Sequence, residues 1–326
     1  AFDTGPSLLT LPAVYRDFFL KTGALMEDVL TQIPVNPAFD YRFADGSNVK
    51  FANLSRYQTL QAITASFGSE AAAQWDQIMK RAEAMWDVSR EPFIESELTS
   101  IAALFKRVTL IRDLLVIAPH KTLREMATEK LTDQRLRYIV DRYATYSGSD
   151  PRKAPAVLLS IAFVEEAFGA WHLAGGIGQL AIAIEKRCLD LGVKIHLNSP
   201  VAKIKTENGV ATGIALTDGT EIAADYIVSN SDASLTYHHL ISPAEKRAKS
   251  ERKNLAKSDS SLAGFSLLLG LRPSDSAEKL NHHTILFPAD YDTEFEAIFT
   301  QKKPVENPTI YICAPNDPLM VKDAGH

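Results

Sequence analysis

Two kinds of side chain in this sequence could do chemistry by their type and spacing. Asp133 and Arg137 are four residues apart, so a helix would carry an acid and a cation on one face. The same spacing could equally give a plain surface ion pair, worth about 0.2–0.5 kcal/mol. His172 follows Trp171 and could move protons, although a histidine beside an aromatic residue is more often a hydrogen-bonded structural group. Spacing alone indicates no strong general base.

Residues that bind metals are sparse. His282 and His283 are adjacent, which can indicate a metal site, but no third ligand stands at a usable spacing. The two cysteines, Cys188 and Cys313, fall in a predicted helix and a predicted strand. This is typical of small buried hydrophobic residues in a reducing compartment. We therefore predict no metal site.

The elements that would position reactive groups are organised around residues 169–232. Gly175 and Gly176 form a turn into an amphipathic helix, and Gly192 ends that helix as a C-cap. The apolar face of the helix follows helical spacing at Ile177, Leu180, Ala181, Ile184, Cys188 and Leu191.

Strands and hairpins are predicted after this helix. Residues 193–197 alternate between apolar and polar, as in a half-buried strand. Asn208-Gly209 and Asp218-Gly219 are hairpin signals with apolar alternation on either side. Residues 224–230 are expected to form a buried strand that ends in a polar turn.

The remaining chain is predicted to mix helices and strands. Other expected elements are a helix from Pro12 to about Gly23, a hairpin over 39–52, helices over 54–147, a charged helical connection over 232–260, a buried strand over 262–271, an edge strand at 285–287 and a strand at 309–314. Two apolar stripes in the helical part are expected to face a core, namely Trp75, Ile78, Met79, Ala82 and Trp86, and Leu98, Ile101, Leu104, Phe105 and Val108.

Composition narrows the class of protein. A chain of 326 residues with 46% hydrophobic residues predicts two or three lobes with a substantial core. The net charge of −5 argues against nucleic acid as a partner. We find no signal peptide and no apolar run long enough to span a bilayer.

Four stretches carry a recognisable order of motifs. They are Phe2-Asp3-Thr4-Gly5-Pro6-Ser7; Ser149-Asp150-Pro151 to Ala156; Gly-x-Trp-x-x-x-Gly-Gly from Gly169, with GVKIHLNSPVAKI and ADYIVSNSD after it; and Leu280–Thr284 with Tyr311–Pro315. In this order they resemble the carotenoid desaturases of the bacterial phytoene desaturase type, within the flavin-dependent amine oxidase superfamily. The resemblance covers essentially the whole chain.

The resemblance implies a flavin amine-oxidase-like α/β (α+β) fold with three parts. These are a partial FAD-binding domain at 1–10 and 165–235, a mixed-sheet substrate domain at 11–54 and 255–326, and a helical lid at 55–150. The family's dinucleotide fingerprint and its C-terminal flavin segment are not found in the sequence. Gly175-Gly176-x-Gly178 is the nearest match to the fingerprint, but it follows an aromatic loop. We interpret the chain as part of a longer enzyme.

The resemblance also implies site residues. Those expected at the FAD cofactor are Gly5, Pro6, Gly175, Gly176, Val201, Asn230 and Asp232. In the family, an acid and an arginine placed like Asp133 and Arg137 line the end of the substrate channel near the flavin, and we expect these two to act in catalysis. Gly5 would let the backbone approach a flat ring.

The implied activity is FAD-dependent desaturation of a carotenoid precursor of the phytoene or diapophytoene type. No side chain accepts a hydride, so the flavin would do so, with quinone or oxygen as the final acceptor. Other polyene or isoprenoid oxidation or isomerisation stays open, as does a truncated, non-catalytic lipid-binding relative. A cytoplasmic enzyme at a membrane surface is expected. Residues 106–117, basic and apolar, are the candidate membrane contact, or else a packed lid helix.

Overall fold

A computed structural model describes residues 3–96, 109–258, 261–270 and 280–320. It divides into two units, one of residues 1–187 with 261–326 and the other of residues 188–260. The first unit contains a four-stranded mixed sheet in the order β3-β2-β8-β9. Its strands are β2 (Phe39–Arg42), β3 (Asn48–Phe51), β8 (His283–Leu286) and β9 (Ile310–Cys313).

The hairpin predicted over 39–52 is confirmed, because β2 and β3 pair antiparallel around the Asp45-Gly46 turn. The strand predicted at 309–314 is confirmed as β9. The strand expected at the edge, β8, is instead interior: it runs parallel to β2 and antiparallel to β9. Its run of buried residues suits a strand that has neighbours on both sides.

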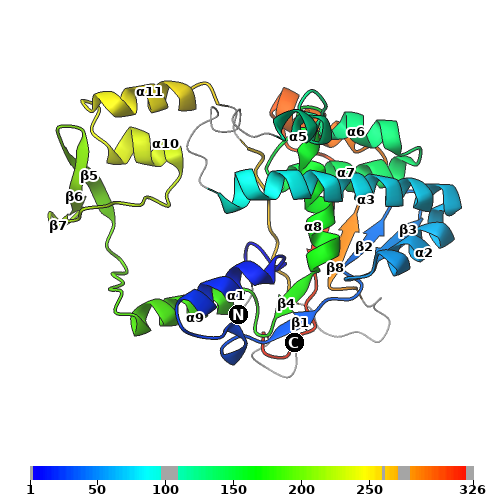
Figure 1. The fold of residues 1–326 in the computed structure, drawn as a ribbon, viewed down its shortest axis with the longest axis horizontal. Helices are drawn as coiled ribbons and strands as arrows, with labels where there is room; N and C mark the ends of the chain where they lie inside the picture. The colour runs from blue at the N-terminus through cyan, green and yellow to red at the C-terminus, as the bar shows by residue number, and fades with distance from the viewer. Residues whose placement is uncertain (1–2, 97–108, 259–260, 271–279, 321–326) are drawn as a thin grey trace. The chain divides into compact units, whose positions relative to one another are not determined.

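Helices pack beside this sheet (Figure 1). The helical segments are α2 (Arg56–Phe67), α3 (Ser69–Arg90), the π-helix η2 (Glu91–Glu95), α5 (Leu110–Ile117), α6 (Leu123–Lys130), α7 (Gln134–Thr145), η3 (Ala156–Leu159), α8 (Ser160–Phe168), α12 (Asp292–Phe295) and η5 (Glu296–Gln301). The first predicted stripe is confirmed, since all five of its members on α3 are buried. Phe51 of β3 meets Trp75 edge to face at 5.1 Å, which joins the sheet to the helices. The second stripe, at residues 98–108, lies outside the described residues.

A smaller core lies around a two-stranded sheet of β1 (Gln32–Pro34) and β4 (Trp171–Leu173). Helix α1 (Pro12–Lys21) begins at the predicted proline, and the short η1 (Met26–Asp28) follows it. Helix α9 (Gly178–Asp190) begins after the glycine turn as predicted. Only part of its predicted apolar face is covered, because Leu180 is buried while Leu191 is 53% exposed.

The second unit contains the predicted meander. Strands β5 (Val201–Glu207), β6 (Val210–Leu216) and β7 (Glu221–Ala223) pair antiparallel, with turns at the two predicted Asn-Gly and Asp-Gly pairs. The predicted charged helical connection is confirmed as α10 (Ala233–Leu235), the π-helix η4 (Thr236–Leu240) and α11 (Lys246–Leu255).

Three predicted strands are wrong. Residues 193–197, 224–230 and 262–270 have no strand conformation, and most of their large apolar side chains are exposed, as with Val228 at 94% and Phe265 at 89%. A strand needs a neighbour that forms a ladder of backbone hydrogen bonds with it. Within the described residues these segments pair with no strand, and their backbone contacts are isolated ones, such as the Ala224 amide to the Thr212 carbonyl and the Leu262 amide to the Gly148 carbonyl. Among the described helices, none combines the length and apolar character that a membrane span requires.

Candidate functional site

The Gly175-Gly176 turn is fixed by a carboxylate from the start of the chain. Asp3 accepts hydrogen bonds from the backbone amides of Ile177, at 2.9 Å, and Gly178, at 3.1 Å, where α9 begins. Gly175 and Gly176 both have positive φ, at 85° and 94°. A Cβ on Gly176 would stand 2.9 Å from both Asp3 carboxylate oxygens. The turn therefore requires glycine for its backbone angle and for the close approach of Asp3.

A second carboxylate closes the other side of the turn. Asp317 Oδ2 accepts the Gly175 amide at 2.6 Å and lies 2.8 Å from His172 Nε2, and both side chains are buried. Burial raises the pKa of Asp317, but hydrogen bonds from His172 and Gly175 outweigh it and leave that pKa below its usual value. His172 is thus hydrogen-bonded to a carboxylate, which agrees with its interpretation from the sequence as a hydrogen-bonded structural group rather than a proton carrier.

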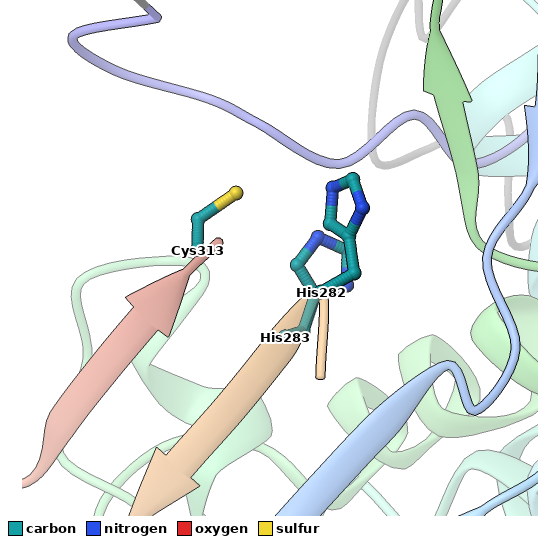
Figure 2. A group of neighbouring side chains, drawn as sticks. All are labelled: His282, His283 and Cys313. Carbon is teal, nitrogen blue, oxygen red and sulfur yellow. The ribbon is translucent and has the colours of Figure 1, made fainter. Parts of the chain in front are cut away.

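Strand register assembles a cluster next to this turn (Figure 2). His283 at the start of β8 pairs with Cys313 at the end of β9. One ligand atom from each of His282, His283 and Cys313 lies within 4.8 Å of the others. The ring centroids of His172 and His282 are 5.0 Å apart, which connects the cluster to the Asp317 carboxylate. Sequence spacing offered no third ligand, whereas the pairing of β8 with β9 brings Cys313 beside the two histidines.

Burial keeps both histidines of the cluster neutral. It lowers the pKa of His282 to about 4, helped by the nearby His172. It lowers the pKa of His283 to about 3, helped by His282. Burial also raises the pKa of the Cys313 thiol. The cluster as it stands is therefore uncharged at neutral pH.

The segment Gly5-Pro6-Ser7 runs past these strands. Ser7 Oγ lies 3.3 Å from the Tyr311 hydroxyl of β9. Gly5 and Pro6 are exposed, and a Cβ built on Gly5 would meet nothing within 4 Å. The backbone at Gly5 is therefore open on that side to a flat group.

A buried ionic network, which sequence analysis missed, joins the sheet to two helices. Arg142 of α7 donates to the hydroxyls of Tyr41 and Tyr146, both at 3.0 Å. Its Nη2 lies 3.6 Å from Glu165 Oε2 of α8, and Tyr146 also donates to Glu165. Burial raises the pKa of Glu165 while Arg142 draws it down. The available signal was a charge inside an apolar run, as Glu165 is in the segment IAFVEEAF.

A cavity of about 20 Å³ lies between sheet and helices beside this network. Its wall includes Phe39, Phe51, Trp75, Met79, Tyr143 and Glu165. That volume is enough for about one water molecule, not for a polyene.

The predicted catalytic pair does not form an ion pair. Asp133 is the N-cap of α7 and accepts the Arg135 amide at 2.8 Å. It is bridged to Arg135 Nη2 at 2.7 Å rather than to Arg137. Arg137 instead donates to the carbonyls of Leu131, at 2.7 Å, and Thr132, at 3.1 Å. Both side chains hold the start of α7 in place.

The other predicted cofactor residues belong to the second unit. Val201 begins β5 opposite Leu216 and is half-buried. Asn230 is exposed, and Asp232 caps α10 by accepting the Ser234 amide at 2.7 Å. The structure thus brings the Gly175-Gly176 turn together with Asp3, while Val201, Asn230 and Asp232 lie on a different unit.

Comparison with known proteins identifies relatives. The first, 4,4'-diaponeurosporene oxygenase from Staphylococcus haemolyticus (strain JCSC1435), is 29% identical over 100% of this chain and 64% of that protein. A second, 4,4'-diapophytoene desaturase (4,4'-diapolycopene-forming) from Methylomonas sp, is 27% identical over 95% of this chain and 59% of that protein. The chain spans about three fifths of the length of these relatives. A putrescine oxidase structure (A394C mutant) has a TM-score of 0.48 at 14% identity, covering 77% of this chain and 52% of that one.

A family model bears directly on classification. The model described as flavin containing amine oxidoreductase matches residues 24–263. This range includes the sheet strands β2 and β3, the helices α2 to α9 and the whole meander. Because the match extends over well over half of the sequence, this chain belongs to the flavin containing amine oxidoreductase family.

Proposed function

We propose that the protein is an FAD-dependent oxidoreductase that desaturates CH–CH bonds of a carotenoid precursor of the phytoene or diapophytoene type. The observation that carries this proposal is the match to a flavin containing family, combined with relatives over essentially the whole chain that are named for carotenoid desaturation and oxygenation. A bound flavin supplies the hydride acceptor that amino-acid side chains lack.

The residues around the Gly175-Gly176 turn fit one wall of a flavin site. Gly5 has open space where its Cβ would stand, so a flat ring can approach the backbone there. The amides at the start of α9 already bind Asp3, so they serve to position the turn rather than to hold a phosphate. We assign Gly5, Pro6, Gly175 and Gly176 to the ring.

Contacts to the rest of the cofactor are assigned to the second unit. Val201 would meet the adenine end through backbone atoms, and Asn230 and Asp232 would lie beneath the cofactor. Asp133 and Arg137 remain our proposed residues at the inner end of the substrate channel. Their present bonds to Arg135 and to backbone carbonyls would give them a positioning role there.

We propose that each of the three parts predicted from the sequence has its own role. Residues 1–10 and 165–235 would contribute to the FAD-binding domain, residues 11–54 and 255–326 to a substrate-binding sheet, and residues 55–150 to a lid. A lid of helices over the sheet would exclude water from a polyene. This favours hydride transfer over side reactions.

A membrane surface is the proposed source of the substrate, because such hydrocarbons dissolve in lipid. Helix α5 supports this, since Ile111 and Leu115 are 78% and 71% exposed and Arg112 is exposed between them. Basic and apolar side chains together suit the headgroup region of a bilayer. We propose a cytoplasmic, peripherally bound enzyme that passes electrons to quinone or oxygen.

The test uses the protein expressed from its complete coding sequence. Purified protein is expected to show flavin absorbance, and FAD is identified by mass after release. Anaerobic incubation with phytoene or diapophytoene in liposomes should bleach the flavin and yield products two hydrogens lighter. Adding quinone or oxygen in separate samples identifies the acceptor. A folded protein without flavin that binds polyenes would overturn the proposal in favour of a lipid-binding relative.

Terminal oxygenation is the second candidate, because the first relative is named an oxygenase. Labelled dioxygen separates the two reactions. An oxygenase incorporates the label into a carotenoid end group, whereas a desaturase gives unlabelled product with a longer chromophore.

A further inference from the structure

We propose that His282, His283 and Cys313 bind a soft divalent metal ion, with Zn²⁺ as the best match. Imidazole nitrogen and thiolate sulfur are the donors that zinc prefers, and three protein ligands leave a fourth position for water or a substrate group. This site goes beyond the flavin chemistry proposed above, and it is the candidate metal cluster among the described residues.

The strand register places two of the ligands together. His283 and Cys313 are directly opposite each other on antiparallel strands β8 and β9, so their side chains lie on the same face of the sheet. The backbone pairing continues past the strand ends, since the amide of Ala314 donates to the carbonyl of His282 at 2.8 Å. His282 is therefore held at the same corner by backbone bonds independent of any metal.

The buried state of His283 points to a missing partner. Its side chain is fully buried, and its Nδ1 lies 3.0 Å from the carbonyl oxygen of Ala38. Only a protonated Nδ1 can donate to a carbonyl, so Nε2 carries a lone pair. That Nε2 has no hydrogen-bond partner among the described residues. Metal-bound histidines commonly donate their other ring N–H to a backbone carbonyl in this way.

His282 also has a ring nitrogen that lacks a hydrogen-bond partner. Its Nε2 is also buried without a hydrogen-bond partner in the described part of the chain. Two unpartnered buried nitrogens in adjacent residues are costly, at about 1–3 kcal/mol each, unless a ligand satisfies them. A hydrocarbon substrate has no group that could do so, whereas a metal ion accepts both lone pairs.

The three ligand atoms need to move only slightly closer together to bind one metal ion. The ligand atoms lie within 4.8 Å of one another, while bonds of about 2.0–2.3 Å to zinc in a tetrahedral site bring ligands to about 3.3–3.8 Å apart. Rotation of the three side chains supplies this difference. Coordination breaks the Cys313 S–H bond and releases the proton to solvent as the metal–sulfur bond forms. Figure 2 shows the sulfur and the two rings at the strand ends.

The experiment uses tag-free protein expressed from its complete coding sequence, with Zn²⁺ and Co²⁺ as probes. After incubation with Zn²⁺ and gel filtration, elemental analysis should find one zinc per chain. Co²⁺ should give a thiolate-to-cobalt charge-transfer band in the near ultraviolet. Sub-stoichiometric zinc together with no such band in the wild-type protein would overturn the proposal, whatever the flavin content.

Matched variants assign the ligands. Cys313→Ser should abolish the charge-transfer band and weaken zinc binding by at least the roughly 10- to 100-fold that outer-shell changes cost. Cys188→Ser removes the other cysteine, and His196→Asn removes an exposed histidine. Both should bind zinc as the wild type does. Zinc bound equally well by Cys313→Ser and by His282→Ala would reject this site. Flavin content is read in the same samples, so failure here is distinct from failure of the proposed redox function.

Discussion

Gly176 must be glycine for two reasons, namely its positive φ and the Asp3 carboxylate that lies where a Cβ would stand. We predict that Gly176→Val abolishes flavin retention, because a Cβ there displaces the Asp3 carboxylate that holds the start of α9. Gly192→Val is the matched control. It carries a similar positive φ and hence a similar strain of about 1–2 kcal/mol, but its Cβ meets nothing within 4 Å. Flavin absorbance per chain is the measurement, and equal flavin in both variants would contradict the assignment of the turn.

Asp141 is the residue from which we predict a pH dependence. Burial raises its pKa from 3.8 to about 7, although Arg124 donates to it at 2.8 Å and draws the pKa down. The folded state therefore binds a proton that the unfolded state releases, and stability falls as pH rises from about 4 to about 7. Relative to wild type, Asp141→Asn should be more stable at both pH 5 and pH 8, and its advantage should grow between these pH values by on the order of 2–4 kcal/mol.

Urea midpoints at both pH values measure this difference. If the ion pair with Arg124 dominated instead of burial, Asp141→Asn would be the less stable protein at the higher pH. Asp17→Asn, at an exposed ion pair on α1, is the control and should show little change.

At the scale of elements, Arg142 couples α7 to α8 and to the sheet. Arg142→Met leaves the buried Glu165 carboxylate without its cation, and we predict a loss of about 3–5 kcal/mol in the free energy of unfolding. Adding Glu165→Met should restore part of it. Arg16→Met breaks an exposed pair with Glu27 and should change the free energy of unfolding far less, because solvent screens that pair. Additive losses in the double variant would show that the pair is not coupled.

Helix α5 is the element on which membrane contact can be tested. Ile111→Ser and Leu115→Ser each remove an exposed apolar side chain. If these side chains enter the bilayer, each change should weaken binding to anionic lipid vesicles about tenfold. Tyr57→Ser on α2, where the side chain is 71% exposed, is the control. Sedimentation with vesicles gives the partition coefficient, and equal partitioning by all three variants would exclude α5.

At the scale of the whole molecule, helices could be predicted more reliably than strands. A helix satisfies its backbone within one segment, so the 3.6-residue period identified the α3 stripe around Trp75 correctly. Hairpins such as Asn208-Gly209 were also predictable, because their partner is adjacent in sequence. Residues 193–197 and 224–230 were predicted as strands from their side chains alone, and among the described residues they pair with no strand.

The sequence by itself determined the family, the order of the helices and the glycine turn, because these depend on local spacing and motif order. Only the tertiary structure decided which groups meet. The pairing of β8 with β9 joined Cys313 to two histidines, the chain ends brought Asp3 and Asp317 to one turn, and helix packing buried Arg142 against Glu165. These contacts join residues far apart in sequence. Strand register and packing against distant elements set them, and neither is encoded in local periodicity.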